Sequence, residues 1–377
     1  MIVVDESFWG THAANIGALE RELARLRRAA VAHAKERGFA VARASVLNLV
    51  VYAEREVHAR RAASTIADLA LRHPSRAIVV LADRVREGIE ASAQLHCHVP
   101  RVDDVEQICY EQVFARVRGD FDERVASVVI PLLVPDLPVF LWWTGTPPPQ
   151  ARQLDDLIRL ADRLIVDSAD FARPDRTLPQ IAALAKRDIA ITDLNWARLT
   201  PWRELVAQFF DVPAWRPFVE GITGIRIGFA VDMDGRDIHP SQALLLLGWL
   251  ASRLGWRPHE SLAPSEAGGL LFRVSRTDGA PIMVRLRPRF ERGLETGDVS
   301  GVRIQASARG AAAEFVIKRA PDERHATATV IIDGARRSER VVPLPLPHVR
   351  DLLGEELSIA GSDDVYEAAL AALMALA

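Results

Sequence analysis

The chain has 377 residues, more than one hydrophobic core usually serves, so its length favours two domains over one. Hydrophobic residues make up 49% and charged residues 26%, the balance of an ordinary globular protein, which excludes a disordered or fibrous chain. The 47 Lys and Arg residues are offset by 50 Asp and Glu residues, and the net charge is -3. This balance gives no overall attraction to nucleic acid or to anionic membranes, so we expect neither as a partner.

The cysteine count and the N-terminal sequence bear on where the protein works. Cys97 and Cys109 are too few for a disulfide framework in so long a chain, which favours a reducing compartment, although a bridge between the two stays open. The N-terminal sequence MIVVDESFWG lacks the basic start and apolar stretch of a secretory signal. The most apolar stretch, residues 125–143, is interrupted by prolines and is expected to be core rather than a membrane span. We therefore expect a cytoplasmic protein.

The first predicted element is an amphipathic helix over residues 15–37, which Gly38 ends. Its apolar stripe recurs at alternating steps of three and four and consists of Ile16, Leu19, Leu23, Leu26, Ala30 and Ala34. Such a stripe packs either on the chain's own body or on a partner helix, and we expect the first.

Strands and helices alternate through the next part of the chain. Two apolar runs, residues 44–53 and 76–82, are joined by a helix that ends before Pro74, which suggests a parallel unit buried on both faces. Residues 92–99 alternate between apolar and polar and predict a half-exposed strand. From residue 137 the patterns predict strand 139–143, helix 151–161, strand 163–168, helix 178–187, strand 189–193 and helix 201–210, the last with Thr200 as its N-cap.

A proline-rich segment at residues 211–217 separates this part from one in which strands and helices follow a different order. Beyond it the patterns predict a strand at 222–231, a helix at 241–254, five short strands between 270 and 342, and terminal helices. Alternation of helix and strand indicates a parallel sheet, whereas grouped strands indicate an antiparallel one. The sequence therefore predicts an α/β protein: an N-terminal domain (1–215) with a mostly parallel sheet flanked by helices, and a C-terminal α+β domain (216–377) with an antiparallel sheet.

Short catalytic and cofactor motifs are missing from the sequence. The chain has no glycine-rich dinucleotide or phosphate loop, no H-E-x-x-H, no G-x-S-x-G and no C-x-x-C. His96 and His98 share one face of their predicted strand and could supply two metal ligands, but no third ligand is evident. We therefore expect no cofactor and no metal, while an enzyme without a short motif stays possible.

Polar side chains follow three of the predicted parallel strands, as Thr144-Gly145, Asp167-Ser168, and Asp193 with Asn195. Ligands of open parallel sheets bind beyond the carboxyl ends of the strands, so these residues could line a cleft. Asp167 and Asp193 could do acid–base work there if burial raised one pKa. The alternative, which we favour, is that these residues cap turns and helices.

Arginines alternate with apolar residues in one predicted strand of the second half. Arg285, Arg287 and Arg289 fall on one face of that strand. A row of guanidinium groups suits phosphate or carboxylate groups, including those of a partner protein. An ordinary solvated sheet face explains the same pattern equally well.

The chain contains eight tryptophans, a residue type favoured at the centre of protein interfaces. Trp142 and Trp143 lie where a predicted strand ends, and Trp202 lies on the apolar face of a predicted helix, where we expect it in the core. Trp196, beside Asn195 in a predicted loop, is the better candidate for the surface.

Four segments, taken together, resemble one family. They are HPSRAIVVLAD (73–83), VPDLPVFLWWTGTPP (134–148), DRLIVDSADF (162–171) and DLNWARLTPWRELVAQFFD (193–211). In kind and order they are similar to the OpcA family, the glucose-6-phosphate dehydrogenase assembly proteins. The resemblance implies a non-catalytic subunit, without a cofactor, that binds glucose-6-phosphate dehydrogenase, promotes its active oligomer and raises its activity in the oxidative pentose phosphate pathway.

The resemblance and the arginine row together supply the candidates for contact with that partner. They are Trp142, Trp143, Arg163, Asp167, Asn195, Trp196, Arg198, Arg285, Arg287 and Arg289. The competing hypothesis is a sugar-phosphate-binding protein, or an enzyme without a recognised motif, that uses a cleft lined by Asp167, Ser168, Asp193 and Asn195.

Overall fold

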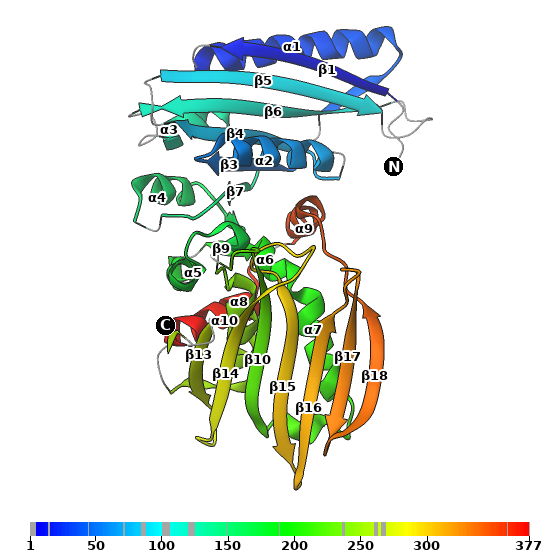
Figure 1. Cartoon of the computed structure of the whole chain (residues 1–377). Helices are drawn as coiled ribbons and strands as arrows, with labels where there is room; N and C mark the ends of the chain where they lie inside the picture. Colours follow the sequence, from blue (N-terminus) through cyan, green and yellow to red (C-terminus); the bar gives the residue numbers. More distant parts are fainter. Residues whose placement is uncertain are drawn as a thin grey trace. The chain divides into compact units, whose positions relative to one another are not determined.

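The computed structural model divides the chain into two compact units (Figure 1). It describes residues 5–13, 16–43, 45–70, 72–83, 88–99, 106–119, 125–148, 150–187, 189–235, 238–259, 263–264, 269–359 and 361–376. The first unit consists of Met1–Asp167, Asp188–Thr192 and Val349–Ser362, and the second of Ser168–Arg187, Asp193–His348 and Asp363–Ala377. Because these segments interleave along the chain, a division into two consecutive domains, 1–215 and 216–377, stays a proposal.

A mostly parallel sheet forms the centre of the first unit, as predicted. Its strand order is β1-β5-β6-β4-β3-β7-β8-β9, with β2 beside β6. The β1–β5 and β5–β6 pairs are antiparallel, whereas β2, β3, β4, β7 and β8 pair in parallel. The strands are β1 (Asp5–Ala13), β2 (Ala40–Arg43), β3 (Leu47–Ala53), β4 (Ser75–Asp83), β5 (Gly88–Val99), β6 (Glu106–Arg118), β7 (Val139–Trp143), β8 (Arg163–Val166) and β9 (Ala190–Asp193).

Helices pack on this sheet because its central strands are apolar on both faces. Every residue of β3 is buried, which explains why its sequence is a continuous apolar run rather than an alternating one. The helix α1 packs along β1 and β5, and α2 along β3 and β4. The helical elements of this unit are α1 (Ile16–Glu36), α2 (Glu56–Leu69), α3 (Val125–Val129), η2 (Ile130–Leu132), α4 (Arg152–Ile158) and α9 (Val349–Glu356).

The apolar stripe of α1 packs on the chain's own sheet, as expected. Leu26 and Ala30 form one buried cluster with Leu95, Cys97 and Cys109 of β5 and β6. The structure joins the two cysteines by a disulfide bond, with a Cα–Cα distance of 4.1 Å. The bridge that the sequence left open is therefore present across the β5–β6 pair.

A buried network of charged residues fixes α1 to the sheet. Arg76 of β4 is 2% exposed and donates hydrogen bonds to the carboxylate of Glu111, to that of Glu20 at 2.6 Å, and to the carbonyl of Leu132 at 3.1 Å. Arg27 donates two more bonds to Glu111, at 2.6 and 2.9 Å. Because Glu20 and Arg27 lie on α1, while Arg76 and Glu111 lie on β4 and β6, these bonds join the helix to two strands.

The second unit contains a mostly antiparallel sheet of order β11-β13-β14-β10-β15-β16-β17-β18, with β12 beside β13. Its described pairs are antiparallel except β10–β14. Six strands, rather than the expected five, follow residue 269, because the last run turns back as a hairpin. The strands are β10 (Ile222–Val231), β11 (Arg257–Pro258), β12 (Ala263–Pro264), β13 (Leu270–Ser275), β14 (Pro281–Phe290), β15 (Val299–Ala308), β16 (Ala311–Arg319), β17 (His325–Ile332) and β18 (Ala335–Pro343).

Helices cover one face of this second sheet (Figure 1). The helix α7 packs on β16, α8 packs on β10, and α10 packs on α8. Close approach of α10 requires Gly248, because a Cβ there would lie 2.5 Å from the carbonyl oxygen of Ala369. The helical elements are η3 (Ser168–Asp170), α5 (Pro174–Leu184), η4 (Ala185–Arg187), α6 (Leu194–Arg198), α7 (Thr200–Asp211), η5 (Arg216–Phe218), α8 (Ser241–Leu254) and α10 (Asp364–Leu376).

The predicted helix 201–210 is α7, with one correction at its start. Leu199 occupies the cap position, and no side-chain cap bond is made there. The hydroxyl of Thr200 instead accepts a hydrogen bond from Arg203 at 2.8 Å, so the predicted N-cap is wrong by one residue. The core position expected for Trp202 is confirmed, since its side chain is 2% exposed.

Among the described helices, none combines the length and the apolarity needed to cross a lipid bilayer.

Candidate functional site

The side chains expected to line a cleft after β9 are buried in the second unit. Asp193 caps α6: one carboxylate oxygen accepts hydrogen bonds from the backbone N–H groups of Asn195 and Ser168, both at 2.9 Å. Its other oxygen accepts a bond from the hydroxyl of Tyr366 at 3.3 Å. Burial, with the neighbouring charge of Asp193, raises the pKa of Tyr366 well above its usual range, so the hydroxyl stays a donor. Asp193 therefore serves as a cap, the reading that we favoured.

Asn195 is the centre of a buried hydrogen-bond network. Its amide nitrogen donates to the hydroxyls of Ser168 at 3.1 Å and Ser241 at 2.9 Å, and its carbonyl oxygen accepts from Gln242 at 2.9 Å. Gln242 also donates to Asp298 at 2.8 Å. Both amide hydrogens and one of the two acceptor positions of the carbonyl oxygen are thus occupied by protein partners, and the side chain is fully buried. This network joins η3, α6, α8 and the start of β15, with Asn195 fully buried among them.

Trp196 lies in α6 rather than in a loop, and the expectation of a surface position is wrong. Its indole N–H donates to Asp363 at 2.8 Å, and its ring packs against Tyr366. The guanidinium of Arg203 lies over the ring at 3.6 Å from its centroid, a cation–π contact. With 3% of its surface exposed, Trp196 belongs to the core of the second unit.

The candidates in the first unit are also buried. Trp142 and Trp143 end β7, and the ring of Trp143 stacks on Tyr52 at a centroid distance of 4.1 Å. Arg163 donates to the hydroxyl of Thr192 at 2.7 Å and to the backbone carbonyls of residues 359 and 361. Asp167 is 5% exposed. These residues are therefore positioned to hold the first unit together.

The structure gives no support to the metal site considered at His96 and His98. The ring of His96 stacks on Tyr110, and His98 is buried. In the part of the chain that is described, no group of three or more His, Cys, Asp or Glu residues is placed to hold a metal ion.

The arginine row predicted at residues 285–289 lies on the helix-free face of the second sheet. Arg285 and Arg289 are exposed and Arg287 is half-buried, whereas Val284 and Leu286, which alternate with them, are fully buried on the helix side. The predicted alternation of β14 is thus confirmed.

Two further arginines join this row through strand pairing. Arg226 of β10 is the register partner of both Arg285 on β14 and Arg303 on β15. The sequence pattern did not single out Arg226, which stands alone between two isoleucines. The available signal was the alternation of residues 222–231, with glycines at 224 and 228 on the face of Arg226.

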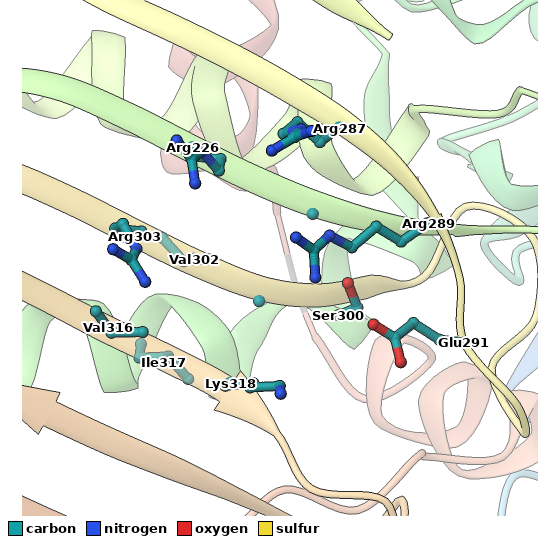
Figure 2. Close-up of a pocket in the computed structure, with 12 residues that line it drawn as sticks. Arg226, Arg287, Arg289, Glu291, Ser300, Val302, Arg303, Val316, Ile317 and Lys318 are labelled. Atoms are coloured by element: carbon teal, nitrogen blue, oxygen red, sulfur yellow. The ribbon is translucent and has the colours of Figure 1, made fainter. Parts of the chain in front are cut away.

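A pocket of about 110 Å³ lies among these side chains, which we call the basic pocket (Figure 2). It is lined by Arg226, Gly228, Arg287, Arg289, Glu291, Ser300, Gly301, Val302, Arg303, Val316, Ile317 and Lys318. Arg303 is paired with Glu314 at 3.0 Å. Burial, together with the charges of Arg287, Arg303, Arg285 and Arg289, lowers the pKa of Arg226, which reflects the concentration of positive charge on this face.

Arg198, the remaining candidate, lies at the end of α6 and is half-buried. Its charge acts on the carboxyl of Asp298, where it opposes the rise in pKa that burial causes. Of the ten candidates, only Arg198 and the row Arg285, Arg287 and Arg289 therefore present accessible surface.

Two family models match most of the chain. Both describe a glucose-6-phosphate dehydrogenase subunit: the model of its N-terminal domain matches residues 66–183, and the model of its C-terminal domain matches residues 189–370.

Curated relatives carry the same family name. A protein named OpcA from Synechocystis sp. is 31% identical over 327 residues, which are 83% of this chain and 66% of that protein. A protein of the same name from Nostoc punctiforme is 35% identical over 192 residues, which are 51% of this chain and 40% of that protein. The chain thus spans less than two thirds of the length of these relatives.

Solved structures resemble this chain only distantly. A 3-ketoreductase from Actinomadura kijaniata has a TM-score of 0.47 and 10% identity, over 88% of this chain and 95% of that chain. A similarity of this size carries no argument about function. The two family models and the relatives, in contrast, agree along most of the sequence: the chain belongs to the OpcA family of glucose-6-phosphate dehydrogenase subunits.

Proposed function

We propose that this protein is a non-catalytic subunit that binds glucose-6-phosphate dehydrogenase and promotes its active oligomer. It would act in the cytoplasm, in the oxidative pentose phosphate pathway. The observation that carries the proposal is the match of two consecutive domains of a glucose-6-phosphate dehydrogenase subunit to residues 66–183 and 189–370.

The geometry supports a binding role over a chemical one. Ser168, Asp193 and Asn195, which could have lined a cleft, are buried and hydrogen-bonded to other groups of the protein. Accessible charge gathers instead on the helix-free face of the second sheet. Arginine is enriched in protein interfaces, and a face of this kind suits an acidic partner surface. Arg285, Arg287 and Arg289, with Arg198, remain our candidates for contact.

Activation requires that the protein bind one state of the dehydrogenase better than the other. A partner with equal affinity for the active and inactive forms would shift nothing, however tightly it bound. The proposal therefore commits to preferential binding of the active oligomer.

A rate measurement tests this proposal. Purified protein is titrated into its cognate dehydrogenase, and the rate with glucose 6-phosphate is followed at each ratio. We expect the rate to rise and then saturate at a fixed stoichiometry. A rate that stays unchanged at every ratio would overturn the proposed function.

A charge-reversal variant tests the proposed contact surface. The triple variant Arg285→Glu, Arg287→Glu and Arg289→Glu should lose capture of the dehydrogenase in a pull-down, because the reversed face repels an acidic partner. The matched control reverses Arg336, Arg337 and Arg340 of the edge strand β18, which makes the same change in net charge. Equal loss in both variants would assign the effect to overall charge rather than to this surface.

A further inference from the structure

The basic pocket holds more positive charge than its own carboxylates neutralise. Among the described residues, Arg226, Arg287, Arg289 and Lys318 line the pocket without an ion pair, and Glu291 is the acidic residue in the lining. The Nε atom of Arg226 is buried and has no hydrogen-bond partner in the described part of the chain. Like charges held together repel, and a buried donor without a partner costs stability. This cluster of positive charges therefore lowers the stability of the protein unless an anion is bound.

The floor of the pocket is bare backbone. Gly228 of β10 and Gly301 of β15 are register partners, so two neighbouring positions on this face carry no side chain. A Cβ at Gly228 would lie 2.9 Å from the hydroxyl of Ser300, which lines the pocket. The hollow of about 110 Å³ has room for several water molecules, and hence for a small solute.

The charged side chains are arranged around this floor. Figure 2 shows Arg226 on β10, Arg303 on β15 and Lys318 on β16, with the guanidinium group of Arg289 between β10 and β15. They come from four adjacent strands, β14, β10, β15 and β16, so backbone pairing fixes their relative positions. Arg285 has the same chemistry on the same face but does not line the pocket.

We propose that the basic pocket binds a phosphomonoester, a small molecule that carries a dianionic phosphate group. The planar forks of Arg226, Arg287 and Arg289 suit phosphate oxygens, and Lys318 adds a compact charge at the rim. A dianion neutralises two of the unpaired cations at once, which a single carboxylate does not. The bare floor and the concave shape suit a small molecule within the hollow, and the exposed Arg285 outside it stays available to a partner surface. This site goes beyond the proposed function, because binding of a dehydrogenase does not require a bound phosphate.

Isothermal titration calorimetry on the full chain tests the site, with inorganic phosphate and glucose 6-phosphate as separate probes and glucose as the uncharged control. We expect saturable binding of glucose 6-phosphate, weaker binding of inorganic phosphate, and none of glucose. Affinity should rise between pH 5.5 and pH 7.5, because a phosphate group loses its second proton at a pKa of about 6. Failure of both anions to bind at millimolar concentration would overturn the proposal, as would tighter binding of inorganic phosphate, which would leave only a general anion site.

Single substitutions test whether glucose 6-phosphate binds in the basic pocket or to the charged face as a whole. Arg287→Gln and Arg289→Gln should each weaken binding of glucose 6-phosphate by about ten-fold or more, since each removes a charge-assisted hydrogen bond. Arg285→Gln, the matched control on the same strand, should change the affinity by no more than about three-fold, because it acts only through screened charge. Equal weakening by Arg285→Gln and Arg287→Gln would contradict a defined pocket.

Thermal melting checks that these variants are still folded. Glucose 6-phosphate should raise the melting temperature of the wild type and of Arg285→Gln, but not that of Arg287→Gln. Because no dehydrogenase is present in these experiments, their failure leaves the proposed function intact, and failure of the rate titration leaves the phosphate site intact.

Discussion

Arg76 in the first unit and Arg226 in the second both lie on central strands of a sheet, but their surroundings are opposite. Arg76 is surrounded by acceptors, with hydrogen bonds to Glu20, Glu111 and a backbone carbonyl. Arg226 is surrounded by other arginines, and its Nε has no partner among the described residues. The first arrangement stabilises the fold. The arginines around Arg226 lower the stability of the fold unless an anion binds among them. Such an arrangement is typical of an anion-binding site.

The comparison extends to the two sheets. In the first unit β4 is buried at every position except Asp83, so the charge of Arg76 must be neutralised within the protein. In the second unit β14 alternates buried and accessible positions, so one face can display charge. Charged side chains on the accessible face of β14 therefore leave the apolar core on its other face undisturbed.

The largest expected effect is at the buried network of the first unit. Arg76→Met should lower the free energy of unfolding by about 3–5 kcal/mol, because it leaves the buried Glu111 carboxylate without one of its cations. Urea denaturation measures this loss. Arg60→Met, at an exposed pair with Glu56, is the control and should change stability far less, because solvent screens this pair. A loss at Arg76 no larger than the control would break the comparison.

A smaller effect is expected at Asn195, the structural network of the second unit. Asn195→Ala leaves the buried Gln242, Ser168 and Ser241 short of a partner and should cost about 1–3 kcal/mol. The folded variant should still activate the dehydrogenase, since Asn195 is buried in the core. Loss of activation with unchanged stability would instead place Asn195 in the contact surface.

Arg226→Gln should have the opposite sign to Arg76→Met. Removing one unpaired charge from a row of arginines should leave the free energy of unfolding unchanged or raise it by up to about 1 kcal/mol. Urea denaturation at low salt reveals the difference best, because salt screens the repulsion. A loss of about 2 kcal/mol or more would mean that Arg226 is held by the fold like Arg76.

The smallest expected effect concerns pH. Burial raises the pKa of Asp298, so the folded protein binds that proton more tightly than the unfolded chain does. Its contribution to stability is therefore complete below the ordinary aspartate pKa of 3.8 and is lost as pH rises through the raised value. Unfolding measured in urea from pH 4 to pH 7 should show this loss in the wild type but not in Asp298→Asn.

Asp278 provides a control of opposite sign for the pH series. A hydrogen bond from Arg276 lowers the pKa of this carboxyl, so its contribution is present above the ordinary pKa and is lost as pH falls. If Asp298→Asn and Asp278→Asn changed the pH profile in the same direction, the assignment to burial at Asp298 would be wrong.

Local patterns predicted the elements but not the surroundings of single side chains. Strand 139–143 and helix 241–254 were predicted with the bounds that the structure has, since both are strongly apolar and sharply delimited. Trp196 was misplaced because its partner, Asp363, lies 167 residues away in sequence. Arg226 was missed for the same reason: only the pairing of β10 with β14 and β15 brings it beside the arginine row.

The family segments illustrate this limit. Asp193, Asn195, Trp196 and Trp202, all from DLNWARLTPWRELVAQFFD, are buried, so the segment that identifies the family is explained by folding. The accessible row of Arg285, Arg287 and Arg289 lies outside the segments that carried the resemblance, whereas Arg198 lies within the last of them. Most residues of the segments that identify the family are therefore not the residues that we propose as partner contacts.

Sedimentation velocity of the cognate dehydrogenase, alone and with this protein at equal concentration, tests the central claim most directly. We predict that the dehydrogenase moves to a faster-sedimenting species that also contains this protein, and that the Arg285, Arg287 and Arg289 reversal abolishes the shift. Two independent boundaries, at the positions of the separate proteins, would contradict the assignment of this chain as a subunit that promotes the active oligomer.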